Sequence, residues 1–85
     1  MSVTKEMLTE AVLEYVRENC PCTSQAIRAG LDPKYTNVLP MGRLAMIMKE
    51  LVGHGFVEVY SERRHDRPRV YVSKEYADRM MRMEE

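Results

Sequence analysis

The segment 40–72 constrains the fold of this 85-residue chain more than any other segment. Apolar residues recur at three- and four-residue spacing after Pro40, which predicts an amphipathic helix with proline at its first position. Gly55 should end that helix, because glycine readily adopts the left-handed conformation that closes many helices. Two runs of alternating apolar residues follow, at 56–61 and 69–72, and predict a β-hairpin.

The remainder of the chain shows three more helical patterns, at 4–19, 24–29 and 74–83. Each pattern starts at or just after a residue whose side chain can cap a helix: Thr4, Thr23 and Ser73. Gly30 is expected to end the second helix in a left-handed conformation, and residues 32–39 to form a connecting loop that can include one 3₁₀ turn.

The order of these elements predicts one α+β domain over residues 1–85. Cys22 and Thr23 can add a very short strand to the hairpin. Within the hairpin, Tyr60 and Tyr71 are expected to pair across the two strands on the face opposite the valines. The expected architecture is therefore a three-helix core, a hairpin and a C-terminal helix.

The composition is that of a folded protein, since 45% of the residues are hydrophobic. No apolar run approaches the roughly 20 residues that a membrane-spanning helix needs. The first residues lack the basic-then-apolar order of a signal peptide. We therefore expect no membrane partner and a cytoplasmic, intracellular location.

The charge is balanced overall, with 13 basic and 13 acidic residues, but it is unevenly distributed. Residues 1–32 hold three basic and five acidic groups, and residues 33–73 hold seven basic and four acidic groups. The positive excess therefore coincides with the helix–hairpin segment, as a local site for a polyanion would require. An acidic row at four-residue spacing marks the first helix and is interpreted either as a solvated face or as a surface that repels DNA: Glu6, Glu10, Glu14 and Glu18.

The two cysteines, Cys20 and Cys22, leave three interpretations open. They can be reduced thiols packed near a helix end, or form an intermolecular disulfide. They can also bind zinc together with His54 or His65, although the paired Cys-x-x-Cys spacing of most zinc sites is missing. We predict no metal site and no cofactor.

Three stretches of the sequence resemble the winged helix-turn-helix superfamily of small regulators. Residues 23–31 resemble the first helix of its helix-turn-helix. Residues 48–57 resemble the end of its recognition helix, with a Leu-x-x-Leu-x-x-x-Gly-like pattern before the strand, and 63–72 resemble its wing and return strand. The resemblance implies double-stranded DNA as the partner, with the helix after Pro40 in the major groove and the wing on the minor groove or phosphates.

The residues expected to contact DNA form three groups. In and before the recognition helix they are Lys34, Tyr35, Thr36, Asn37, Gly42, Arg43, Met46 and Lys49. On the wing they are Arg63, Arg64, His65, Arg67 and Arg69, and at the start of the second helix Ser24 and Gln25. Arg43 is the main candidate for reading bases, because arginine can bind guanine through two hydrogen bonds. The loop before the recognition helix is included because it is about eight residues long, where the family usually has three or four.

The last helix carries an apolar stripe that is interpreted either as a flexible edge of the core or, as we predict, as a homodimer interface: Tyr76, Met80, Met81 and Met83. The resemblance implies that such helices pair across a two-fold axis, so that a dimer reads a palindromic site. The smooth, weakly charged face around Gly42 and Met46 leaves a second interpretation, a protein-interaction or RNA-binding module in a transcription, replication or ribosomal assembly. The sequence holds no phosphate-binding loop, nucleophile elbow or zinc-protease motif, so we expect neither an enzyme nor a small-molecule ligand.

Overall fold

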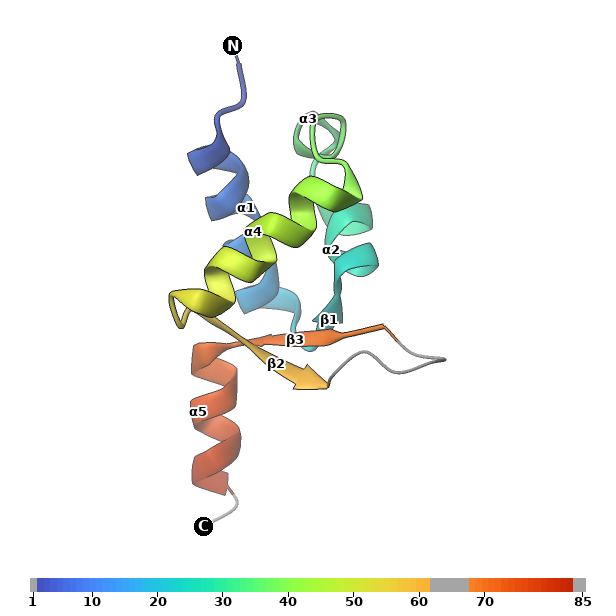
Figure 1. Cartoon of the computed structure of the whole chain (residues 1–85). Coiled ribbons are helices and arrows are strands. Elements are labelled where there is room, and N and C mark those ends of the chain that lie inside the picture. The colour runs from blue at the N-terminus through green and yellow to red at the C-terminus, as the bar shows by residue number, and fades with distance from the viewer. Residues whose placement is uncertain (1, 62–67, 84–85) are drawn as a thin grey trace.

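The computed structural model describes residues 2–61 and 68–83, which form a mixed α+β structure (Figure 1). These residues contain five helices and one three-stranded antiparallel sheet. The helices are α1 (Lys5–Asn19), α2 (Ser24–Gly30), α3 (Pro33–Thr36), α4 (Met41–Gly53) and α5 (Lys74–Met83). The strands are β1 (Cys22–Thr23), β2 (Val57–Ser61) and β3 (Val70–Ser73).

Side-chain caps start three of the helices where the sequence predicts them. The Thr4 hydroxyl accepts a hydrogen bond from the Met7 N–H at 3.2 Å at the start of α1. The Thr23 hydroxyl accepts a hydrogen bond from the Ala26 N–H at 3.2 Å at the start of α2. The Ser73 hydroxyl accepts one from the Tyr76 N–H at 3.1 Å at the start of α5. Each hydroxyl satisfies an N–H group that has no partner inside its helix. The predicted starts of α1, α2 and α5 and their caps are therefore confirmed.

The predicted end of α4 is also confirmed, and its predicted start is wrong by one residue. Gly55 has φ of 82°, the left-handed conformation in which a side chain is strained, and follows the C-cap residue His54. Pro40 is the N-cap with extended backbone, so Met41 is the first helical residue. The Met41 side chain, at the start of the helix, is 42% exposed.

The prediction that Gly30 ends α2 in a left-handed conformation is wrong. Gly30 belongs to the helix, and within the described residues only Gly55 has a positive φ. The physical reason for the glycine is a close approach: a Cβ atom at Gly30 would overlap the ring of Tyr15 from α1. The glycine lets the two helices pack closely.

The predicted loop 32–39 contains the short helix α3, and hydrogen bonds join this segment to α2. Asp32 caps it by accepting a hydrogen bond from the Lys34 N–H at 3.0 Å. The Thr36 hydroxyl donates to the Arg28 carbonyl at 3.0 Å, and Arg28 Nε donates to the Leu39 carbonyl at 2.9 Å. These bonds hold the long connection between α2 and α4 in a fixed shape.

The strands have the order β1–β3–β2, and all pairs are antiparallel. The predicted addition of β1 to the hairpin is confirmed, since Cys22 pairs with Tyr71. The predicted Tyr60–Tyr71 pair is wrong: Val59 lies opposite Tyr71, and an irregularity between Val59 and Ser61 leaves Tyr60 without a partner in the register. Tyr71 is consequently buried, whereas Tyr60 is 55% exposed.

The hydrophobic core lies where α1, α2 and α4 pack together on one side of the sheet. Its fully buried members include Leu8, Val12, Val16, Ile27, Leu39, Leu44, Met48 and Val57. Figure 1 shows α5 on the other side of the sheet, extending away from this core. The described chain is accordingly elongated, with extents of 47 × 28 × 21 Å. None of its helices in the described ranges combines the length and apolar character needed to cross a membrane.

Candidate nucleic-acid interface

One face of α4 is exposed along the whole helix. Gly42, Arg43, Met46 and Lys49 all lie on it, and Met46 is 67% exposed. The opposite face is buried in the core through Leu44, Ile47, Met48 and Leu51. The exposure predicted for the four residues is therefore confirmed, and α4 presents them together to solvent.

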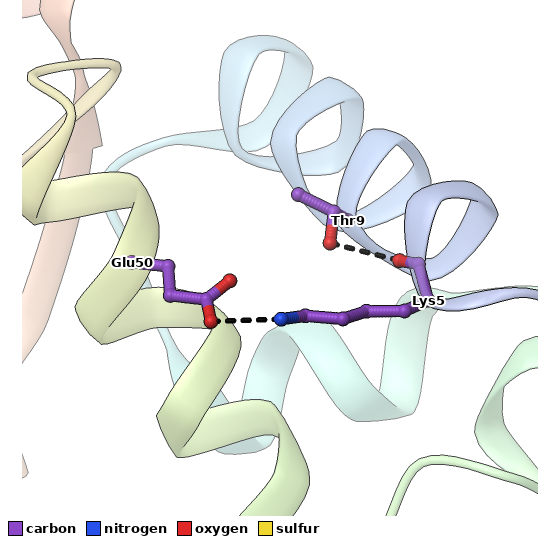
Figure 2. A network of polar contacts seen from close by, with 3 residues as sticks. All are labelled: Lys5, Thr9 and Glu50. Carbon is purple, nitrogen blue, oxygen red and sulfur yellow. Dashed lines mark hydrogen bonds and ion pairs between the residues drawn. The ribbon is translucent and has the colours of Figure 1, made fainter.

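Two cations on this face are available to a ligand. Among the described residues, neither Arg43 nor Lys49 has an ion-pair or hydrogen-bonding partner on its side chain. Glu50, the acid next to Lys49, is engaged elsewhere: its carboxylate lies 2.9 Å from Lys5 Nζ of α1 (Figure 2). This exposed pair contributes little to stability, but it keeps the acid turned toward α1.

A groove of about 270 Å³ lies beside the N-terminal end of α4. Gln25 from α2, Thr36 from α3 and Asn37 from the α3–α4 turn line it together with Met41, so three predicted contact residues from separate elements meet here. Arg28 also lines it and was missed in the sequence. It lies one turn after Gln25 on α2, and that three-residue spacing was the available signal.

Four residues of the α2–α4 connection were predicted to contact DNA, and they do not lie on one common surface: Lys34, Tyr35, Thr36 and Asn37. Thr36 is half-buried, and its hydroxyl is used in the fold. Tyr35 lines a different groove, against α1, and Lys34 Nζ lies over its ring at 5.0 Å from the centroid. Only Thr36 and Asn37 line the groove beside α4. Lys34 and Tyr35 therefore do not line this groove, although they belong to the same short helix α3 as Thr36.

The structure describes two of the remaining predicted DNA contacts, Ser24 and Arg69. Ser24 is half-buried in the first turn of α2, and the exposed Arg69 directly precedes β3. The wing residues Arg63, Arg64, His65 and Arg67 lie outside the described residues, so their role stays a prediction.

The predicted dimer residues of α5 border the hairpin. A groove of about 220 Å³ between α5 and the hairpin is lined by Glu58, Val59, Tyr60, Val72, Tyr76, Ala77, Met80 and Met81. Tyr76 and Met80 are half-buried there, and Met81 is 67% exposed. The side chain of Met83 lies outside the part of the chain that the structure describes, so its role in a dimer stays a prediction. This surface is apolar and open in the single chain.

Both cysteines are free thiols close to the start of the sheet. Cys20 Sγ lies 3.7 Å from the Ser73 hydroxyl, and Cys22 is buried in β1. Burial, and then the nearby Cys20, raises the pKa of the Cys22 thiol to about 11. Cys22 is therefore protonated at neutral pH and a poor nucleophile or metal ligand. No cluster of three His, Cys, Asp or Glu side chains suited to a metal occurs in residues 2–61 and 68–83.

The chain matches no protein-family model, no curated protein and no solved structure. The function proposed below is therefore supported by the residues and distances of this chain alone. The features that bear on it are the exposed face of α4, the groove at its first turn and the basic segment between β2 and β3.

Proposed function

We propose that this chain binds double-stranded DNA as a small transcriptional regulator of the winged helix-turn-helix type. In this arrangement α2 and α4 form the helix-turn-helix, and the β2–β3 hairpin is the wing. The observation that carries the proposal is Arg43, an unpaired and exposed arginine in the first turn of a helix whose other face is buried.

The size and chemistry of α4 support a place in the major groove. Its 13 residues are about 20 Å long, and a helix fits the roughly 12 Å width of that groove. Arg43 can then bind guanine O6 and N7, while Lys49 one and a half turns later meets phosphate. Arg28 and Gln25, on the neighbouring helix, are suited to the phosphates that flank the groove entrance.

Replacing Arg43 with alanine should weaken binding to the preferred duplex by about 1–3 kcal/mol and relax the preference for one base pair. The preferred duplex is obtained first, by selecting bound sequences from a random pool. Affinity is then measured by fluorescence anisotropy on that duplex and on single-base variants. Arg79→Ala on α5 removes the same charge from an exposed site and should leave affinity and base preference unchanged. Equal effects of the two substitutions would contradict base reading by Arg43.

We further propose that two chains pair through α5 and the adjoining hairpin groove, so that the DNA site is palindromic. Met81→Asp should then convert a dimer into a monomer, because it places a charge in the apolar contact. Arg79→Asp is the matched control, since it lies on the opposite side of α5 and should keep the dimer. Light scattering gives the mass of each variant. A monomeric wild-type protein, or a dimeric Met81→Asp variant, would contradict this interface.

A second function is favoured by one observation, the apolar character of the α4 region. Val38 and Met41 are each 42% exposed and Met46 is 67% exposed, which is unusual for a surface that meets only phosphates. A partner protein could bind this surface in a transcription, replication or ribosomal assembly. Gel shifts on mixed DNA and RNA at low salt separate the possibilities. A monomer that binds neither nucleic acid would favour the protein-interaction role.

A further inference from the structure

A separate groove of about 390 Å³ runs between α1 and the segment that joins α2 to α3. No residue of α4 or the hairpin lines it. Its floor is apolar or aromatic. Ala11, Tyr15, Leu31 and Tyr35 are half-buried there, and Met7 is 40% exposed at one end. The residues on its rim are exposed acids: Glu10, Glu14, Glu18 and Asp32. The groove is thus apolar inside and negative at its edges.

The floor of this groove depends on a specific packing arrangement. The Tyr15 ring lies against Gly30, where any Cβ would overlap it, so the glycine makes room for the ring between α1 and α2. Tyr15 and Tyr35 are both half-buried, and among the described residues neither phenolic hydroxyl makes a hydrogen bond. The floor therefore offers apolar ring surface together with two polar groups that a ligand could engage.

The negative charge of the rim is not neutralised within the described chain. The two cations of α1 are directed elsewhere, with Lys5 paired to Glu50 and Arg17 paired to Glu75 at 3.4 Å. No lysine or arginine of the described chain lines the groove itself, and the cation that borders it is Lys34, held over the ring of the lining residue Tyr35. Four acids against one cation repel nucleic acid and anionic membranes. The complementary ligand is a polypeptide that carries positive charge.

We propose that this groove binds one amphipathic, lysine- or arginine-rich helix of a partner protein. The groove side of α1 extends from Met7 to Glu18, which is about 16 Å and matches three turns of a helix. A helix of that kind can place an apolar stripe on Tyr15 and Leu31 while its cations meet the acids on the rim. The proposed partner uses a different surface from the proposed DNA site, so the chain could bind both at once.

The test uses a synthetic three-turn helix with leucine at positions i, i+3, i+4 and i+7 and lysine on its flanks. Binding is followed by amide chemical shifts of the labelled full-length protein. We expect shifts concentrated on Met7, Ala11, Tyr15, Leu31 and Tyr35. The same peptide with glutamate in place of lysine should not bind. Shifts centred on α4 or α5, or spread evenly over all exposed acids, would overturn the proposal.

Reversing the charge of the rim acids tests how strongly the rim contributes to peptide affinity. The triple variant Glu10→Lys, Glu14→Lys, Glu18→Lys should weaken peptide binding at least tenfold. The matched control makes the same change in net charge on the hairpin and α5: Glu58→Lys, Glu75→Lys, Asp78→Lys. The control should bind within a factor of about three of the wild type, because long-range attraction is screened by salt. The single variant Glu14→Lys repeats the test with minimal risk to folding. Equal losses in the rim and control variants would disprove the groove as the binding site.

Discussion

Leu44→Ala should lower the free energy of unfolding by about 2–5 kcal/mol. Leu44 is fully buried on the core side of α4, so alanine leaves a cavity among tightly packed neighbours. A domain of this size has roughly 5–15 kcal/mol of stability in total, so the loss is a large share of it. The measurement is urea-induced unfolding followed by circular dichroism. The midpoint should fall while the denaturant dependence stays unchanged.

Met46→Ala is the control for this prediction, on the same helix and also a truncation of a large apolar side chain. Met46 is 67% exposed, so its loss should change the free energy of unfolding by no more than about 0.5 kcal/mol. The pair tests which face of α4 is buried. Similar costs for both substitutions would mean that Met46 packs against something, and the exposed face proposed for DNA would have to be redrawn.

The elements that the sequence predicts correctly are those governed by local chemistry. The helical period after Pro40 identifies the buried and exposed sides of α4 because one amphipathic helix must bury its apolar stripe. The caps at Thr4, Thr23 and Ser73 were predictable because each hydroxyl accepts a hydrogen bond from an N–H only three residues later in the chain. Gly55 was predictable because it follows the last apolar turn directly.

The errors concern contacts between segments far apart in the chain. Gly30 has the position of a helix terminator, yet its role is to accommodate Tyr15 of another helix, and no local pattern encodes that approach. The register of the hairpin is likewise shifted by the irregularity at Tyr60, which places Val59 rather than Tyr60 opposite Tyr71. A single extra residue in a strand changes which side chains share a face.

In the candidate site, too, features set by the local helical pattern were predictable and features set by contacts between elements were not. The exposure of Arg43 and Met46 follows from the period of α4 alone. The separation of Tyr35 from Asn37 does not, because it results from the Thr36 and Arg28 hydrogen bonds that fix α3. Arg28 lies one turn from Gln25 on α2, but only the folded connection brings both residues beside Asn37 and the start of α4.

The largest effect on DNA affinity is expected from the basic segment between β2 and β3. Residues 33–73 carry seven basic and four acidic groups, and three of the seven basic groups are Arg63, Arg64 and Arg67. If four to six cations meet phosphates, the logarithm of the binding constant should fall with the logarithm of salt concentration at a slope of about −4 to −5. Counterion release makes this contribution independent of sequence, so it is measurable on random duplex DNA.

Replacing Arg63, Arg64 and Arg67 with alanine should reduce the magnitude of that slope by about 2.7 and lower affinity at 0.1 M salt by roughly 10²-fold or more. Each lost phosphate contact removes about 0.9 from the slope, whereas loss of net charge alone acts weakly across a Debye length of about 10 Å. The matched control is Arg17→Ala, Lys74→Ala, Arg79→Ala, which removes the same charge from exposed positions of α1 and α5. The control should retain the wild-type slope. If both triple variants lower it equally, the DNA senses only net charge, and the hairpin is not a wing that contacts phosphates.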